Sequence, residues 1–278
     1  GKEHWLAVVA ARLAGGRPIV RTRHIAQAVR PHAGNRWLYG RATALVVTVT
    51  EAIRGQCLAA GLLPPARIVT LAGGADAEAY RPGPRGIGGR RRLGAEGDQP
   101  LVGMVSGLRV MKGHRVVIAA LAQLAEQGRR PHVAFIGRGA LEPALREAVA
   151  GAGLESQVTF AGFVGDGPAA MAALDLGLYV PLESDGMSRV VFEYLASARP
   201  LIASRVGVVP EALSDDEHAA LVPAGDPAAL AATLTALLDD ASRRARLAEA
   251  GRRLVLARYS GARLAESLES CYARLTAA

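Results

Sequence analysis

The chain has 278 residues, of which 50% are hydrophobic and only 4% aromatic, and it carries a formal net charge of +8. This length exceeds one small core and suits two α/β domains of roughly 100 to 200 residues. No stretch approaches the roughly 20 consecutive apolar residues of a membrane span. The basic surplus consists mainly of arginines scattered along amphipathic segments, without the aromatic residues of a base-stacking platform. Composition therefore argues against a nucleic-acid partner and against a membrane-spanning protein.

The start of the chain and its two cysteines indicate a cellular location. The chain begins with Gly, and its opening segment lacks the charged, apolar and small regions of a signal peptide, so we expect no export. Cys57 and Cys271 lie far apart and fit neither a disulfide scaffold nor a metal-ligand spacing. We expect a cytoplasmic protein. Attraction of its basic surface to anionic lipid leaves peripheral contact with the inner face of the cell membrane as an open alternative.

Residues 1–83 predict a thin α/β unit. Apolar residues recur at helical spacing in three segments and form short runs of strand type in three others. We expect helices over 3–14, 34–43 and 51–60, and strands over 18–21, 44–49 and 67–71. Three strands are few for a Rossmann unit, so we interpret 1–83 as a partial N-terminal domain on the acceptor side, with earlier elements outside this chain.

Residues 84–100 belong to a run dense in Gly, Pro and Arg, which predicts a linker. From residue 101 onward, short apolar runs alternate with helical patterns, an order typical of a parallel, doubly wound sheet. The expected strands cover 101–105, 132–137, 157–163, 176–180, 200–204 and 219–222. The sequence thus predicts an α/β protein with two Rossmann-like domains whose parallel sheets face a cleft, the N-terminal one incomplete.

The chain after Asp226 reads as helices only. Asp226 precedes the first of them in the position of a helix cap. The Tyr259-Ser260-Gly261 sequence breaks the pattern between the last two helices. We therefore expect the second domain to cover 101–258, and a final helix within 259–278 to return toward the N-terminal domain.

The segment 180–211 is the most informative for function, because it runs from a strand through a Gly-containing turn into a helix and a further strand. Such a turn presents free backbone N–H groups and the positive helix end to a pyrophosphate. Gly186 permits close approach there, Asp185 precedes the helix and Glu193 lies within it. Carboxylates accept hydrogen bonds from sugar and ribose hydroxyls. A capping Asp and a surface Glu are the structural alternative.

Three further turns follow strands. In the first, Arg109 and Lys112 offer positive charge for a diphosphate leaving group, with a solvated loop as the alternative. Gly137 lies in the second turn. Val164 lies in the third turn, and backbone atoms of this third turn could meet a nucleobase edge. Both also fit routine βα turns. No Ser-His-Asp order, His/Cys metal cluster or phosphate-binding P-loop occurs in the sequence, which disfavours hydrolase, zinc and P-loop functions.

Several of these motifs occur in one order that resembles a known family. The stretches VGMVSGLRVMKGH, VAFIGRGALEPALREAV, QVTFAGFVGDG, LESDGMSRVVFEYLASARPLIASRVGVVPEAL and ARYSGARLAESLESCYARL together resemble glycosyltransferase family 4. The RTRH and LRVMKGH variants are similar to its lipopolysaccharide and polysaccharide branch, and residues 44–83 are similar to the end of its N-terminal domain. The resemblance covers almost the whole chain and implies the two-Rossmann GT-B fold.

By this resemblance, the chain transfers a sugar from a nucleotide diphosphate donor, UDP- or GDP-sugar, with retention of configuration and without metal or prosthetic group. The implied acceptor is a glycan or a lipid-linked glycan of surface polysaccharide biosynthesis. The leaving phosphate would accept the proton of the acceptor, so the protein would supply positioning and charge stabilisation. The alternatives are a sugar-phosphate synthase, or a catalytically inactive donor-binding partner subunit or fragment.

The resemblance also assigns residues. Asp185 and Glu193 fall on the two acids of the family's E-x7-E motif, for the donor sugar and the ribose, and Lys112 on its phosphate-binding lysine. The loop that meets the sugar and phosphate would be Gly186, Met187 and Ser188, and Val164 would lie on the base-contacting turn. The family often places a histidine of the N-terminal half against the donor sugar, which would be His24, with a structural histidine as the alternative. Arg189 is a cation beside the sugar loop that the family pattern does not include, and a solvated helix surface is its alternative.

The sequence departs from the family pattern in two places. The first acid is Asp185, one methylene shorter than the usual Glu. The usual arginine is also missing at Gly107, and we interpret Arg109, two positions later, as its replacement. Of the other histidines, we expect His114 to lie on a helix surface.

Overall fold

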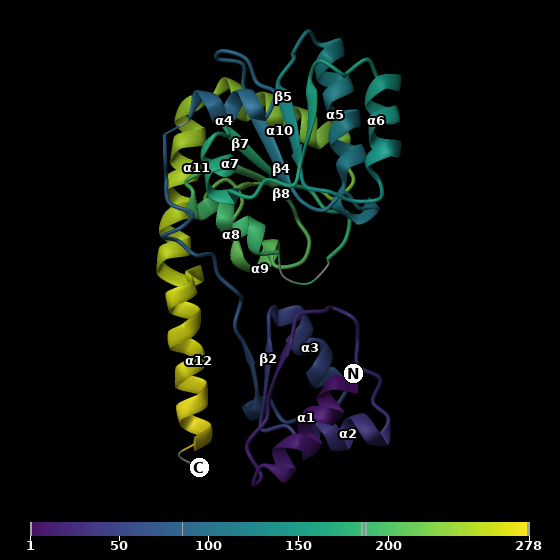
Figure 1. Ribbon diagram of the computed structural model, residues 1–278, viewed down its shortest axis with the longest axis vertical. Helices are drawn as coiled ribbons and strands as arrows, with labels where there is room; N and C mark the ends of the chain where they lie inside the picture. The colour runs from purple at the N-terminus through teal and green to yellow at the C-terminus, as the bar shows by residue number, and fades with distance from the viewer. Residues whose placement is uncertain (1, 85, 185, 187, 277–278) are drawn as a thin grey trace. The chain divides into compact units, whose positions relative to one another are not determined.

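The computed structural model describes residues 2–84, 86–184, 186 and 188–276. Its residues form two compact units, each built on a parallel sheet (Figure 1). The first unit comprises residues 1–73, 184–188 and 261–278, and the second comprises 74–183 and 189–260. No helix in the described ranges is long and apolar enough to cross a membrane.

The first unit contains a sheet in the order β1-β2-β3. All six elements expected before residue 83 are present. Their bounds lie within two residues of the expected ones, except that α2 ends three residues earlier. The helices and strands are α1 (Lys2–Leu13), β1 (Val20–Arg23), α2 (Ala33–Gly40), β2 (Leu45–Thr48), α3 (Glu51–Ala59), a short 3-10 turn (Pro65–Arg67), β3 (Ile68–Thr70) and α12 (Gly261–Thr276).

Strand β2 is buried on both faces, because successive strand residues point to opposite sides of a sheet. On one face, Val46 packs with Leu38 of α2 and Cys57 of α3. On the other, Leu45 and Val47 pack with Cys271 of α12. Helix α12, from the far end of the sequence, therefore completes the core of this unit. Both cysteines are unpaired and buried.

The charge of the chain is concentrated in this unit. Residues 1–73 contain ten Lys and Arg against two Glu, a net +8, whereas the rest of the chain has equal numbers of basic and acidic residues. With few carboxylates nearby, some arginines bond to backbone carbonyls: Arg67 donates to Gly40, and Arg23 to Gln27. The surplus that composition attributes to the whole chain thus belongs to its first quarter.

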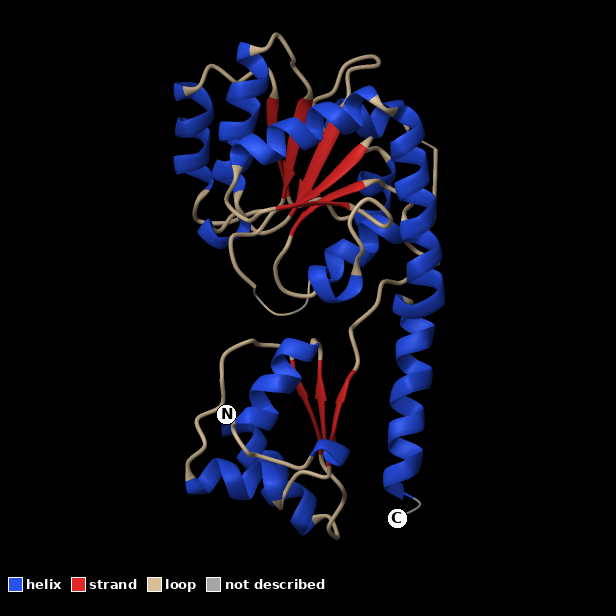
Figure 2. Cartoon of the chain, turned by 180° about the vertical axis from the view of Figure 1, so that it is seen from behind, coloured by secondary structure: helices blue, strands red, loops and turns tan. Residues whose placement is uncertain are grey.

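The second unit contains a fully parallel sheet, whose strands Figure 2 draws in red with helices beside them. The strand order is β6-β5-β4-β7-β8-β9. Every strand expected after residue 100 is present. Its elements are α4 (Ile87–Arg92), β4 (Leu101–Val105), a 3-10 turn (Val110–Lys112), α5 (His114–Glu126), β5 (His132–Ile136), α6 (Glu142–Gly151), β6 (Val158–Gly162), α7 (Gly167–Ala172), β7 (Leu176–Tyr179), α8 (Arg189–Ala196), β8 (Leu201–Ser204), α9 (Val209–Ala212), β9 (Ala220–Val222), α10 (Pro227–Asp239), α11 (Ala241–Leu254) and a π-helical segment (Val255–Tyr259).

Both faces of this sheet are covered. On one face, Val102 and Met104 of β4 join the core that α5, α6 and α10 complete. On the other, Gly103 has no room for a side chain, because a Cβ there would lie 2.3 Å from Leu174. Asp226 caps α10, accepting from the Ala229 N–H at 2.9 Å, as the sequence predicts. The unit is the doubly wound fold that alternating strands and helices predict.

The predicted linker contains a helix that the sequence analysis did not anticipate. Arg90 of α4 donates to Asp175 Oδ2 at 2.8 Å and to the carbonyl of Gln99 at 2.6 Å. The same Asp175 oxygen accepts the Leu101 N–H at 2.8 Å. Both charged side chains are about nine-tenths buried. The segment before β4 is therefore clamped to the amino ends of β4 and β7.

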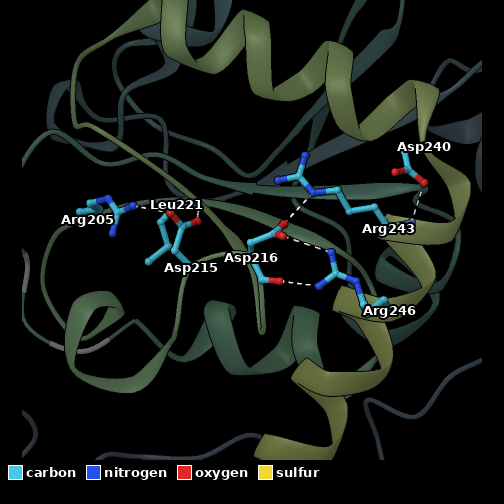
Figure 3. Close-up of polar contacts among 7 residues, drawn as sticks. All are labelled: Arg205, Asp215, Asp216, Leu221, Asp240, Arg243 and Arg246. Carbon is cyan, nitrogen blue, oxygen red and sulfur yellow. Dashed lines mark hydrogen bonds and ion pairs between the residues drawn. The ribbon is translucent and has the colours of Figure 1, made fainter.

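A second, exposed ion cluster ties the loop before β9 to α11 (Figure 3). Asp216, whose backbone φ is +55°, accepts from Arg243 at 2.6 Å and from Arg246 at 3.2 Å. Neighbouring Asp215 bonds to Arg205 and to the N–H of Leu221. Because these groups face solvent, they contribute little each. Helix α11 then passes through the π-helical turn, and α12 begins at Gly261, where a break was expected.

Candidate functional site

The crevice of the second unit lies where its strand order reverses. Chain order runs from β4 outward to β6 on one side and from β7 to β9 on the other, and ligands of doubly wound sheets bind at the carboxyl ends of the strands flanking such a point. β4 pairs with β7 only through Val102 and Gly103. Beyond these residues the two strands no longer pair, which leaves room for a side chain.

Tyr194 of α8 occupies that room. Its hydroxyl accepts the Val105 N–H at 2.8 Å and donates to the Gly103 carbonyl at 3.0 Å, replacing the missing bonds to β7. The ring lies against Gly177, where a Cβ would approach to 2.6 Å. Complete burial raises the pKa of Tyr194 far above its usual value, so the hydroxyl stays neutral. Tyr194 therefore bonds α8 to the end of β4.

A pocket of about 510 Å³ opens at the carboxyl ends of β4, β5 and β6. Predicted residues Gly137 and Val164 both line it. A Cβ at Gly137 would lie 2.0 Å from the Ser106 carbonyl, so only glycine lets the turns after β4 and β5 approach so closely. The lining residues are Val105, Ser106, Gly107, Ile136, Gly137, Arg138, Phe163, Val164, Gly167 and Ala170.

The two predicted cations follow β4. Lys112 is only 8% exposed, at the end of a 3-10 turn, so it does not lie in the solvated loop that was its alternative. Arg109 folds back over Gly107, since a Cβ at Gly107 would lie 3.4 Å from Arg109 Nε. Arg109 also borders an open hollow of about 500 Å³ with Leu182 and Glu183. The Arg109 guanidinium therefore lies beside Gly107, a residue of the pocket wall.

His114 corrects an expectation of the sequence analysis. It begins α5 but is buried, with its ring edge-on to Phe135 at 5.1 Å between centroids. Its Nε2 lies 3.2 Å from the hydroxyl of Ser106, a pocket residue. Burial lowers the pKa of His114 to about 4, and the charge of Lys112 adds to this effect, so the imidazole is neutral at pH 7. His114 is therefore enclosed between Ser106 of the loop after β4 and Phe135 of β5.

Glu193 lies on α8 beside Tyr194 and is 15% exposed. Burial raises its pKa, and Arg189, one turn earlier with 4.0 Å between Nε and Oε1, partly opposes that shift. Arg189 itself is largely exposed. Glu193 is therefore a half-buried hydrogen-bond acceptor rather than a surface glutamate.

Tyr80 is a residue that the sequence analysis missed. Its hydroxyl lies 2.9 Å from the position that a Cβ of Gly167 would take, at the start of α7 and beside the pocket wall. Burial, together with the negative charge of Glu193, raises the pKa of Tyr80. No local pattern could have indicated it, because Tyr80 precedes the second unit's first strand by twenty residues.

The loop after β7 is described in part. Asp185 and Met187 lie outside the described residues. Gly186 has φ +99°, and a Cβ there would lie 1.9 Å from the carbonyl oxygen of His24, so the structure brings these two predicted residues together within the first unit. The His24 side chain is exposed, and Ser188 is half-buried. Among the described residues, no group of three or more His, Cys, Asp or Glu could hold a metal ion.

Several solved structures share this arrangement of elements. HepE of Anabaena, in complex with UDP, matches with a TM-score of 0.85 and 23% identity, over 98% of this chain and 76% of its own. A glycosyltransferase of Rickettsia africae matches with a TM-score of 0.87 and 17% identity, over 98% of this chain and 74% of its own. The fold is therefore GT-B, with two Rossmann-like domains.

Sequence comparison gives the family. Residues 99–240 match the family model described as glycosyl transferases group 1. The D-inositol 3-phosphate glycosyltransferase of Corynebacterium efficiens is 31% identical over 77% of this chain and 52% of its own length. The alpha-D-kanosaminyltransferase of Streptomyces kanamyceticus is 29% identical, over 84% and 61%. The chain belongs to the glycosyl transferases group 1 family, and it spans between half and two thirds of the length of these two relatives.

Proposed function

We propose that this chain binds a nucleotide diphosphate sugar and transfers the sugar to a glycan or glycolipid acceptor. The observation that carries the proposal is the pocket at the ends of β4, β5 and β6, with buried Lys112 on the turn that follows β4 and half-buried Glu193 on α8. Its volume of about 510 Å³ suits a small ligand. Family membership supports the reaction, and the UDP bound to HepE supports the class of donor.

Each part of the donor has a proposed partner in the second unit. Arg109 and Lys112 would neutralise the diphosphate, since fixed positive charge can stabilise a leaving phosphate without a metal. Glu193 would accept hydrogen bonds from the ribose, and backbone atoms near Val164 would meet the base. Desolvation strengthens such bonds, because a buried carboxylate has few competing waters.

The finer assignments rest on the sequence pattern. We propose a retaining enzyme of glycosyltransferase family 4, using UDP- or GDP-sugar without metal, in lipopolysaccharide or surface polysaccharide biosynthesis. We also propose a cytoplasmic location with peripheral membrane contact, and a donor domain over 101–258. Contacts with the donor sugar are proposed for Asp185, Gly186, Met187, Ser188, Arg189 and His24.

Loss of the family's arginine at Gly107 supports a second candidate, a donor-binding protein without transfer activity. The two candidates differ in one outcome. Incorporation of labelled sugar into an acceptor by the purified chain would exclude the second, whereas nucleotide binding is compatible with both.

Thermal stabilisation by UDP, GDP, ADP and CMP tests the donor site, because a ligand that binds the folded state raises its stability by RT ln(1 + [L]/Kd). We expect one diphosphate to stabilise the parent, and Glu193→Ala and Lys112→Ala to lose that effect. Glu249→Ala is the matched control, because Glu249 lies on α11 in an exposed pair with Arg253. No stabilisation of a folded parent by any of the four nucleotides would contradict the proposal.

A further inference from the structure

Phe163 is an exposed aromatic residue at the rim of the pocket. It is 71% exposed, and it lines both the pocket and an adjoining hollow of about 510 Å³ that extends to Arg92 and Leu93 near the linker helix. Exposure of a phenylalanine ring to water is unfavourable. A ligand that covered the Phe163 ring would therefore remove this unfavourable exposure.

A β-bulge near the end of β6 precedes Phe163. Phe135 of β5 pairs with Phe160 of β6, but the next residue, Ile136, pairs with Gly162, so Ala161 is an extra residue in a β-bulge. Gly162 has φ +65°, and its carbonyl accepts the Gly137 N–H at 2.8 Å. Bulges redirect side chains and are frequent beside binding sites. The bulge and the left-handed glycine together fix the direction in which the chain leaves the sheet.

Arg138 borders the same part of the pocket. Its Nε lies 3.8 Å from the position that a Cβ of Gly162 would take, beside Phe163. Its own carbonyl accepts the Leu108 N–H at 3.1 Å, which fixes its backbone between the turns after β4 and β5. No carboxylate in the described ranges forms an ion pair with Arg138. The guanidinium therefore has hydrogen-bond donors available for a ligand.

We infer that Phe163 holds the nucleobase by stacking and that Arg138 determines which nucleobase the pocket accepts. This inference rests on the proposed function and adds the residues that read the base. The face of the base would stack on the Phe163 ring, an interaction open to any base. Arg138 would donate to a carbonyl oxygen on the base edge. Guanine and uracil present carbonyl oxygens to such a donor, whereas adenine presents an amino group at the equivalent position.

Binding of UDP, GDP, ADP and inorganic pyrophosphate, measured by calorimetry on the parent and on Phe163→Ala, tests the stacking role. We expect the parent to favour UDP or GDP over ADP. Phe163→Ala should weaken the preferred nucleotide about tenfold, from loss of stacking, and leave pyrophosphate binding unchanged because pyrophosphate has no base. Phe163→Tyr, which retains an aromatic face, should bind within about twofold of the parent.

Arg138→Ala tests the reading of the base edge. It should reduce the preference for UDP or GDP over ADP about tenfold, while Arg146→Ala, which changes an exposed arginine on α6, should not.

An unchanged nucleotide affinity in Phe163→Ala, or an equal loss for nucleotide and pyrophosphate, would overturn the stacking role. Equal binding of ADP and UDP by the parent would overturn the role of Arg138. A folded parent that binds pyrophosphate but no nucleotide would overturn both, and one that binds none of the four would instead remove the proposed function.

Discussion

The two ends of the strands in the six-stranded sheet are built differently. At the amino ends, charged side chains are buried and bonded to one another or to the backbone where strands begin: Arg90 donates to the Asp175 carboxylate, which accepts the Leu101 N–H, and Arg199 donates to the carbonyl of Leu174 at 2.9 Å. At the carboxyl ends, glycines such as Gly137 bring turns together around an open pocket. The buried bonds at the amino ends therefore support stability, whereas the carboxyl ends form the proposed binding pocket, and substitutions at the two ends should have different consequences.

The largest expected effect is at the amino ends. Asp175→Ala leaves the Arg90 guanidinium and the Leu101 N–H buried without their acceptor, and loss of one partner of a buried pair costs about 3–5 kcal/mol. Urea denaturation at pH 7 measures this loss, and nucleotide affinity of the folded protein should be unchanged. Asp239→Ala is the control, because its pair with Arg129 is exposed. A stability loss no greater than that of the control would contradict the assignment.

Tyr194→Phe tests whether Tyr194 contributes both to stability and to nucleotide affinity. The substitution keeps the ring but leaves the Val105 N–H and the Gly103 carbonyl without their partner, which costs about 1–3 kcal/mol. Because Val105 lines the pocket, nucleotide affinity should also fall. Denaturation and calorimetry on the same sample measure both effects. Tyr272→Phe, on the half-exposed Tyr272 of α12, should change neither, and a Tyr194→Phe variant with full nucleotide affinity would confine Tyr194 to stability.

The buried histidines predict a dependence of stability on pH. The pKa of His114 is about 4 in the folded state and near 6.5 when unfolded, so between these values the unfolded state binds more protons. Its contribution is complete above pH 6.5 and is lost as pH falls toward 4. Urea midpoints at pH 7 and pH 5 measure the difference, which should be smaller in His114→Gln.

Part of this pH dependence should remain in His114→Gln, because burial also lowers the pKa of His132 and brings that of His4 to about 4. His218→Gln is the control, since His218 accepts the Ser214 N–H within its own loop and lies near Glu217. The prediction is wrong if His114→Gln and the parent lose equal stability between pH 7 and pH 5.

The smallest expected effect concerns the exposed cluster of Asp216, Arg243 and Arg246. Asp216→Asn keeps a residue that tolerates positive φ but removes the charge, so stability should fall by less than about 1 kcal/mol. Denaturation at low and at high salt measures it, and the difference from the parent should shrink in 1 M salt. A loss that salt does not reduce would point to the hydrogen bonds rather than to the charges.

The sequence predicted what depends on local pattern. Apolar periodicity located the strands of both sheets, and the position of Asp226 predicted its cap. Gly137 and Val164, chosen because they follow strands, do line the pocket, since the carboxyl ends of parallel strands meet at one edge.

Residues that depend on distant contacts escaped prediction. His114 was wrongly expected on a helix surface, because helical spacing does not show that Ser106 and Phe135 lie against its ring. Tyr80 and Tyr194 gain their positions from Gly167 and from the gap between β4 and β7, both far away in sequence. The helix within the linker, α4, is stabilised through Arg90 by contacts with residues more than eighty positions away.

The uneven charge of the chain has a consequence for how it behaves among polyanions. Its pI near 10.2 is an average over a strongly cationic first quarter and a remainder whose formal charges cancel. On a cation-exchange resin, residues 1–73 should contribute most of the retention, and truncation or charge reversal in that stretch should shift elution more than in the rest of the chain. Added salt would weaken repulsion within the same stretch, so the two units should respond to ionic strength in different degrees.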